Sequence, residues 1–480
     1  MMNRALFVVL VSILVGCGAE APPQPNVVFA IADDWGWPHA GVYGDKVVET
    51  PAFDRLAREG VLFENAYISS PSCTPSRGAI ITGQQFWRLE TAANLWSVWP
   101  SKFAEYPQML AEAGYHTGSY RKGWGPGDHP NSPVNPAGKR YESVDEFFTA
   151  RPEGQPFCFW FGTSDPHRPY EAGSGAASGM DLGQAHLFAH YPDAEEIRSD
   201  VADYYWEVQR WDRDVGDLVE RLEAMGELDN TIIVMTGDHG MPFPRGKSNL
   251  YDSGARVPLA IRWPAAIPGG RRVTDFVSLT DIAPTFLEAA GLAIPAQMTG
   301  RSLLDLLKSG KSGRVEEDRA EVLFGKERHV PSQEAPDNGG YPMRAIRTGD
   351  YLYIRNFEPE RWPSGTPYHE RAQIEDAWLG DCDNGPTKTY LWEHREDAAV
   401  KPFFDLAFAK RPTEELYDLA KDPDQMRNVA ADPAYQTAKE ELAARLTAEL
   451  ERLADPRVLG KGGFFDEQPY LGGGPKFPAE

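Results

Sequence analysis

A cysteine at position 73 stands in a stretch that could prepare it for chemistry. Within Ser69–Gln84, Pro75 follows Cys73 by two residues, and proline suits the first turn of a helix because its missing N–H group would have no partner there. The spacing therefore predicts a helix that begins at Cys73 and continues through Gly78 to Gly83. Free N–H groups at a helix start favour an anion, so Cys73 is either a low-pKa thiolate nucleophile or a buried small residue.

Two apolar runs, far apart in the chain, each end in side chains that can bind a metal ion. Residues 26–32 and 231–236 are continuous apolar segments of strand length, as expected for strands buried on both faces of a parallel sheet. The side chains that follow them are Asp33 and Asp34, then Asp238 and His239. The carboxyl ends of parallel strands meet at one edge of a sheet, so these side chains are expected to converge as candidate metal ligands. A polar strand-to-loop junction is the alternative interpretation of the first pair.

A third apolar run, residues 157–161, is followed by Thr-Ser-Asp-Pro-His-Arg-Pro, which contains His167. The end of such a strand is where α/β sheets bind ligands. A histidine there can give a proton to a departing oxygen or nitrogen, because its pKa lies near neutral pH. A lone histidine is often structural, but this placement favours a catalytic role for His167.

Amphipathic helices separate these runs. Apolar residues recur every three or four positions from residue 199 to 226, which predicts one long helix that is capped by Ser199 and Asp200 and ends at Gly226. Further helices are expected at 51–60, 107–114 and 435–453, and further strands at 115–120 and 351–354. Residues 126–140 are rich in Pro, Gly and Asn and are expected to form a loop.

The composition is that of a globular protein. The 480 residues, 41% of them hydrophobic, can bury a large core, and the length suggests two or three domains. The net charge of −23 argues against nucleic acid as a partner, because phosphate binding needs a basic face. It would also repel any anionic ligand at long range, so recognition of one must come from a local cluster of cations. Four cysteines in a chain of this size do not suggest a disulfide framework.

The N-terminus has the pattern of an export signal. The charged start Met-Met-Asn-Arg is followed by an apolar run, residues 5–15, that is too short to span a bilayer, and then by Gly16-Cys17-Gly18-Ala19. Leu14-Val15-Gly16-Cys17 resembles a bacterial lipobox, which implies cleavage before Cys17 and a lipid on that cysteine. An ordinary signal peptide is the alternative. Either interpretation predicts an exported protein, periplasmic or anchored to the outer membrane of a bacterium by lipid alone.

The segment Cys73-Thr74-Pro75-Ser76-Arg77, with Thr82-Gly83 after it, resembles the signature of the type I sulfatases. In that family a maturating enzyme converts the cysteine to formylglycine, whose hydrate attacks sulfur. The resemblance implies an alkaline phosphatase-like α/β fold, in which a large, mainly parallel sheet is flanked by helices and followed by a smaller C-terminal α+β domain. It also implies one Ca²⁺ beside the modified residue. The ligands it assigns are Asp33, Asp34, Cys73 as formylglycine, Asp238 and, less typically for a hard cation, His239.

Further motifs match the family in the expected order. Lys122, in Arg-Lys-Gly-Trp-Gly, matches a sulfate-binding lysine, although the family's neighbouring histidine is replaced by Trp124 or Gly125. The resemblance implies that His167 protonates the leaving group and that Arg77 and Lys122 neutralise the sulfuryl oxygens together with Lys247. The alternative for the third cation is a solvated loop lysine. Asp34 is a plausible base.

Residues 241–251, which contain Lys247, resemble the N-sulfoglucosamine sulfohydrolase group of the family, as do residues 341–347. The implied substrate is a sulfated carbohydrate, most specifically a terminal N-sulfated glucosamine of heparan or heparin fragments. His329 and Arg344 are hypothesised to line the sugar pocket. Alternatives are an O-sulfatase for another polysaccharide such as an algal glycan, a phosphoester or phosphonate hydrolase, and an inactive glycan-binding lipoprotein.

The resulting division of the chain has four parts. We expect a lipoprotein signal at 1–16, a catalytic domain at 25–340, a C-terminal α+β subdomain at 341–460 and a flexible tail at 461–480.

Overall fold

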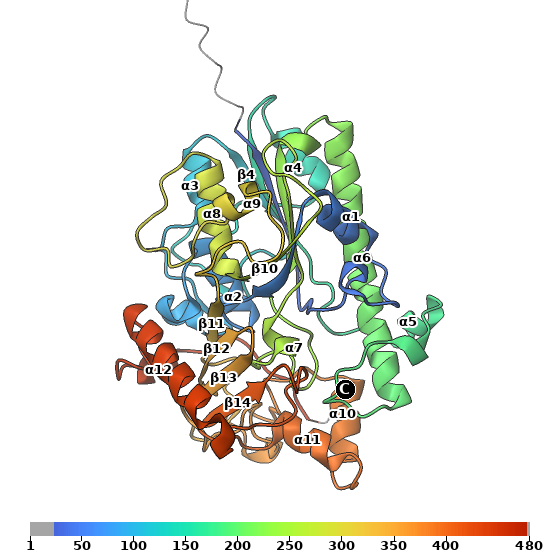
Figure 1. Cartoon of the computed structure of the whole chain (residues 1–480), viewed down its shortest axis with the longest axis vertical. Helices are drawn as coiled ribbons and strands as arrows, with labels where there is room; N and C mark the ends of the chain where they lie inside the picture. The colour runs from blue at the N-terminus through green and yellow to red at the C-terminus, as the bar shows by residue number, and fades with distance from the viewer. Residues whose placement is uncertain (1–23, 478–480) are drawn as a thin grey trace, which may run out of the picture.

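A computed structural model describes residues 24–477, which build a large sheet with helices on both faces and a small sheet below it (Figure 1). The large sheet has eight strands in the order β10-β2-β9-β8-β1-β7-β4-β6. Its strands are β1 (Asn26–Ala32), β2 (Val61–Tyr67), β4 (His116–Tyr120), β6 (Arg140–Tyr141), β7 (Phe157–Gly162), β8 (Thr231–Gly237), β9 (Leu259–Arg262) and β10 (Arg271–Ser278). Only β9 runs antiparallel to its neighbours, so the predicted, mainly parallel sheet is confirmed.

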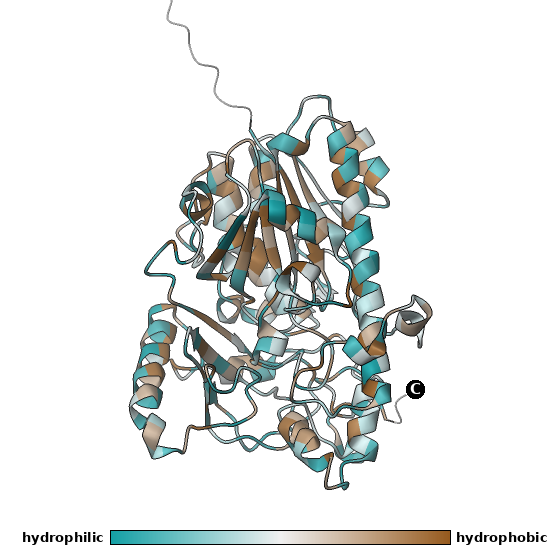
Figure 2. Ribbon diagram, turned by 45° about the vertical axis from the view of Figure 1, so that its right-hand side comes forward, coloured by the Kyte–Doolittle hydropathy of each residue, from teal (hydrophilic) through white to brown (hydrophobic). Residues whose placement is uncertain are grey.

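The strand β1 is apolar throughout because both of its faces are covered. Val27, Phe29 and Ile31 join one buried cluster, whereas Val28 and Ala30 join another on the opposite face. The first cluster is completed by α2 (Cys73–Thr82), α3 (Tyr106–Glu112), α8 (Ile282–Ala289) and α9 (Leu304–Lys308), and the second by α1 (Pro51–Glu59), α4 (Val144–Ala150) and α6 (Glu195–Ala224). Figure 2 shows the strands mostly brown and the surrounding helices alternating between teal and brown, which is the pattern of helices that are buried on one side.

The small sheet is antiparallel and is formed by β11 (Glu321–Lys326), β12 (Met343–Thr348), β13 (Tyr351–Asn356) and β14 (Glu414–Asp418). The helix α12 (Gln436–Arg452) covers one face through Leu442, Leu446 and Leu450, which belong to the same buried cluster as Ile346 and Ile354. Because β11 lies before the expected boundary at 340/341, the small sheet begins earlier in the chain than the predicted second unit.

The remaining short elements connect these layers. They are β3 (Ser97–Val98), β5 (Gly127–Asp128), α5 (Ser174–Ala177), α7 (Asp252–Ala255), α10 (Pro386–Glu393), α11 (Lys401–Phe408) and α13 (Gly463–Glu467). The described part of the expected tail, residues 461–477, packs on the body instead of extending from it: Phe465 is fully buried, and the Leu471 N–H group donates to the carbonyl of Trp96.

Most predicted elements are confirmed within one or two residues, but the long helix starts earlier than expected. The helix α6 begins at Glu195, so Ser199 and Asp200 lie inside it. Asp200 does not cap the helix, because its buried carboxylate instead accepts two hydrogen bonds from Arg168, each 2.7 Å long, and one from Thr387 Oγ1.

Cys17 lies outside the described residues, and the three cysteines within them are unbridged. Between residues 24 and 477, no helix combines the length and the apolar character needed to cross a bilayer.

Candidate active site

Three strands of the large sheet deliver their polar ends to one place. In register, Ala32 at the end of β1 pairs with Gly237 of β8, and Ile31 pairs with Gly162 of β7. A cavity of about 500 Å³ opens beside this edge. Its lining includes Cys73, Lys122, His167, Lys247, His329 and Asp383. The sequence-predicted convergence of the strand ends is therefore confirmed.

Cys73 is the first residue of α2 and is only 2% exposed. Its Sγ atom lies 3.3 Å from His239 Nε2 and 3.6 Å from Asp33 Oδ1. Burial raises the pKa of the thiol well above its usual value, and the neighbouring Lys122 does not compensate for it. A raised pKa disfavours the thiolate form, so this environment does not activate Cys73 as a thiolate nucleophile.

Cys73 and three side chains around it could bind a cation. Ligand atoms of Asp33, Cys73, Asp238 and His239 all lie within 4.8 Å of one another. The His239 Nδ1–H group donates to the carbonyl of Gly240 (3.1 Å), so the lone pair is on Nε2, which faces Cys73 Sγ and the cluster.

Asp34 has a buried carboxylate oxygen without a hydrogen-bond partner among the described residues. Its Oδ1 atom is buried and makes no hydrogen bond to any described residue, although His239 Nε2 is 3.2 Å away. The backbone of Asp34 has φ of 72°, a left-handed conformation uncommon for aspartate, and its N–H group donates to Asp238 Oδ1 (3.0 Å). A carboxylate oxygen held in this way among acidic neighbours suits a divalent cation with oxygen ligands.

Three cations complete the centre. Arg77, one helical turn after Cys73 and fully buried, donates to Asp238 Oδ2 (2.8 Å). Lys122 Nζ lies 2.5 and 2.7 Å from the two carboxylate oxygens of Asp33. Burial would raise the pKa of the Asp33 carboxyl, but the neighbouring cations, Lys122 first, hold it well below its usual range.

Lys247 lies on the other side of the centre, where its Nζ atom is 3.0 Å from Asp34 Oδ2 and 2.9 Å from Asp383 Oδ2. Burial would lower the pKa of this lysine, yet the two carboxylates raise it well above its usual value, so it stays charged. Together, three cations face four carboxylates. A bound dication would turn this balance positive, as the binding of an anion requires.

His167 stands at the mouth of the cavity with a third of its side chain exposed. Its Nδ1–H group donates to the carbonyl of Arg168 (2.6 Å), so Nε2 is the atom that can exchange a proton with a ligand. This Nε2 atom is 3.9 Å from Asp34 Oδ2. The ion pair between Arg168 and Asp200 fixes the loop that carries the histidine.

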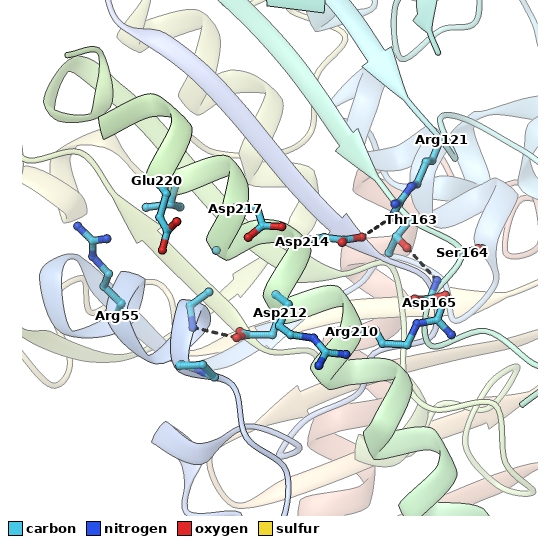
Figure 3. A pocket seen from close by; sticks show the side chains of 15 residues that line it. Arg55, Arg121, Thr163, Ser164, Asp165, Arg210, Asp212, Asp214, Asp217 and Glu220 are labelled. Carbon is cyan, nitrogen blue, oxygen red and sulfur yellow. Dashed lines mark hydrogen bonds and ion pairs between the residues drawn. The ribbon is translucent and has the colours of Figure 1, made fainter. Parts of the chain in front are cut away.

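A larger cavity of about 860 Å³ lies elsewhere, along α6 and the start of α1 (Figure 3). Arg55, Arg121, Arg210 and Arg213 line it, but so do five carboxylates. Several of these charges already neutralise one another; Asp214, for instance, pairs with Arg121. The described lining of this larger cavity does not include Cys73. The smaller cavity, which Cys73 lines, is therefore the candidate active site.

Comparison with known proteins decides the family. The family model described as Sulfatase matches residues 25–292, more than half of the chain, and the model of the N-sulphoglucosamine sulphohydrolase C-terminal region matches residues 237–362. The chain belongs to the sulfatase family. It is thus a hydrolase of sulfate esters or sulfamates.

Relatives and a solved structure agree with this assignment. The sulfatase is 27% identical to the human N-sulphoglucosamine sulphohydrolase, with 92% of this chain and 93% of the human chain covered. It is also 27% identical to an ulvan-active sulfatase of Formosa agariphila, over 92% of this chain and 77% of that protein. A structure solved in complex with its substrate D-glucosamine-2-N,6-O-disulfate superposes with a TM-score of 0.65 at 21% identity, over 90% of this chain and 98% of the other.

Of the two sugar-pocket candidates, the sulfatase brings only one to the cavity. His329 lines it, with Nδ1 2.8 Å from the Oγ atom of Ser72, the residue that precedes Cys73. Arg344 is fully buried away from the described lining of the cavity. Its guanidinium donates to Asp455 and Glu327 at 2.5 to 3.0 Å, so the structure does not bring Arg344 to the described cavity.

Two further residues, Trp124 and Asp383, line the cavity. Trp124, one of the two residues considered to replace the family's histidine, packs its ring on Trp99 with the ring centroids 4.9 Å apart and lines the cavity. Asp383 reaches the site from the long connection between β13 and β14 of the small sheet, and it contacts Lys247. No spacing in the sequence links it to the strand ends, so only the fold reveals it.

Proposed function

We propose that this sulfatase removes the sulfate group from a sulfated carbohydrate, and specifically from the nitrogen of a terminal N-sulfated glucosamine. The observation that carries the proposal is the match of residues 237–362 to the C-terminal model of the N-sulphoglucosamine sulphohydrolases. That segment contains Lys247 and His329, and both line the cavity beside Cys73. Similarity to the human enzyme over nearly the whole chain supports the same substrate class.

The proposal includes two groups that the family uses. When present, formylglycine at position 73 supplies a hydrated aldehyde as nucleophile and a calcium ion polarises the sulfuryl oxygens. Asp33, Asp34, Asp238 and His239 would hold the cation, supported by the unsatisfied Asp34 oxygen and the Nε2 lone pair of His239.

The chain's own residues then have distinct tasks. Lys122 and Lys247 flank the Cys73 position and can each donate to a sulfuryl oxygen, while the buried Arg77 keeps Asp238 and Asp33 in place. His167, held through Nδ1, presents Nε2 toward the cavity and can hand a proton to the departing atom. Asp34 Oδ2 lies 3.9 Å from that nitrogen.

A second candidate is an O-sulfatase, because the ulvan-active relative matches as well as the human one does. We prefer the N-sulfatase because the C-terminal family model is described by the name of that group and the human relative is covered over 93% of its length, against 77% for the ulvan-active sulfatase.

We also propose that the protein is exported and held at a bacterial membrane by a lipid on Cys17. This rests on the N-terminal pattern alone. Replacement of Cys17 by alanine is expected to move the protein from the membrane fraction to the soluble fraction.

The test is sulfate release from a panel of glucosamine N-sulfate, glucosamine 6-O-sulfate and sulfated ulvan oligosaccharides, measured by ion chromatography. We expect the highest kcat/KM on the N-sulfated sugar. A clear preference for an O-sulfate would replace the N-sulfatase by the second candidate.

A further inference from the structure

One carboxylate in the cavity has no role in the assignments above. Asp383 Oδ2 is 2.9 Å from Lys247 Nζ, and the carboxylate lines the same cavity as Cys73 and His167. Ligand atoms of Asp383, Asp34 and His167 lie within 4.8 Å of one another. The Asp383 side chain is 20% exposed, so it faces the space that a substrate would fill.

The loop that carries Asp383 is built to hold it in place. Lys388, which is buried, donates through Nζ to the carbonyls of Trp378, Leu379 and Cys382 at 2.7 to 3.2 Å and to Asn384 Oδ1 at 2.9 Å. A buried ammonium is costly unless its donors are all used, and here they organise the backbone on both sides of Asp383.

A second contact ties the same loop to the small sheet. Asp381, two residues earlier, pairs with Lys326 of β11 (2.6 Å) and accepts a hydrogen bond from the N–H group of Val330 (2.8 Å). Val330 directly follows His329, so the loop and the histidine segment are positioned together. The location of Asp383 is thus fixed by several buried contacts and does not depend on the ion pair with Lys247.

A negative charge at this point opposes the binding of sulfate. Lys247 is already paired with Asp34, and Asp383 further reduces the pull of that lysine on an anion. Asp383 can offset this weaker attraction of the sulfate only if it accepts a hydrogen bond from the substrate or contacts a positively charged group of it. The candidate position is beside His167, where the atom that leaves sulfur receives its proton.

Resting on the proposed function, we propose that Asp383 is a specificity-determining residue that selects a nitrogen leaving atom over oxygen. In hydrolysis of a sulfamate, R–NH–SO₃⁻ and water give R–NH₃⁺ and SO₄²⁻. The S–N bond breaks, and the water oxygen goes to sulfur. The nitrogen takes one proton from His167 and one from the water, and the second proton of the water returns to His167. An O-sulfate instead releases a neutral hydroxyl, so only the amine gains the positive charge that Asp383 can stabilise.

The first test compares Asp383→Asn with the starting protein on glucosamine N-sulfate and glucosamine 6-O-sulfate. A charge-assisted hydrogen bond predicts a loss of about 10- to 100-fold in kcat/KM on the N-sulfate and a change of less than about 3-fold on the O-sulfate. Asp376→Asn, on an exposed aspartate of the same segment, is the matched control and should leave both values unchanged. An equal loss on both substrates would overturn the proposal.

A second measurement separates this proposal from the proposed function. The binding of glucosamine, whose amine is cationic near neutral pH, is compared with that of N-acetylglucosamine by calorimetry, which needs no turnover. We expect glucosamine to bind at least about 10-fold more tightly, and Asp383→Asn to abolish the difference. If the two sugars bind equally, the role of Asp383 is refuted, even in an active N-sulfatase. If glucosamine is preferred but no N-sulfate is cleaved, the proposed substrate is wrong while the amine site stands.

Discussion

At the scale of single residues, most of the candidate site around Cys73 could be predicted from the sequence, because its residues lie in a short motif or directly after an apolar run. Cys73 lies in a helix-start motif, and Asp33, Asp238 and His239 directly follow buried strands. Asp383 has no such signature, because its place is set by a loop packed from another part of the fold.

Lys247 is the residue-scale test of charge neutralisation. Lys247→Ala removes the ammonium that lies within 3.0 Å of both Asp34 and Asp383, leaving two carboxylates without it. We expect kcat/KM to fall by roughly 10²- to 10³-fold, the usual effect of losing one donor to a developing charge. Lys102→Ala, on an exposed lysine, is the control. Unchanged sulfate release by the first variant would remove Lys247 from the site.

At the scale of elements, continuous apolar runs predicted β1, β7 and β8 nearly to the residue, because burial on both faces leaves little choice of side chain. Helix ends were less predictable. Aspartate is common at the N-cap of a helix, but Asp200 lies inside α6 and pairs with Arg168. Arg344 similarly matched a family segment, although its partners Glu327 and Asp455 are brought to it only by the folding of β11, β12 and the end of α12.

Arg344 is expected to act through stability. Arg344→Met leaves the buried carboxylate of Asp455 without its cation and leaves Glu327 with Arg457 alone, so the free energy of unfolding in urea should fall by about 3–5 kcal/mol. The kcat/KM of the folded fraction should stay within about 2-fold of the starting value. A large rise in KM at unchanged stability would instead support the sugar contact.

Glu207 on α6 gives a pH prediction. Burial, with Asp165 beside it, raises the pKa of this carboxyl to about 7. A carboxyl that binds its proton more tightly when folded contributes stability below its unfolded pKa, and that contribution is lost as pH rises to about 7. The free energy of unfolding of Glu207→Gln should therefore equal that of the starting protein near pH 4.5. At pH 8 it should be larger by roughly 1–3 kcal/mol.

The measurement is urea unfolding at both pH values, with Glu220→Gln on the exposed side of α6 as the control. If the Glu207 variant and the starting protein differ in free energy of unfolding by the same amount at both pH values, the raised pKa of Glu207 is contradicted.

At the scale of the whole molecule, the site is assembled from both sheets. Cys73, Lys122 and His167 come from the large one, whereas His329 and Asp383 come from segments around the small one. Tyr67 of β2 and Phe324 of β11 stack at 5.4 Å and join the two sheets in one buried cluster. The sequence indicated two units but not that the pocket needs both, because this depends on contacts between distant segments.

Metal binding should therefore stabilise the whole fold. After chelator treatment, added Ca²⁺ is expected to raise Tm, since a ligand at 100 times its Kd adds about 2.7 kcal/mol to stability. Asp34→Asn should abolish the shift because it removes the carboxylate with the unsatisfied oxygen, whereas Asp424→Asn, on a surface loop, should preserve it. An unchanged Tm with and without Ca²⁺ would rule out the metal site.

The most direct test of the account follows Cys73 itself. Protein made with different amounts of a formylglycine-generating enzyme is analysed by mass spectrometry of the peptide containing residue 73, and sulfate release from glucosamine N-sulfate is measured on the same samples. The account predicts activity proportional to the converted fraction and none in Cys73→Ala. Full activity in protein whose Cys73 remains an unmodified thiol would contradict it.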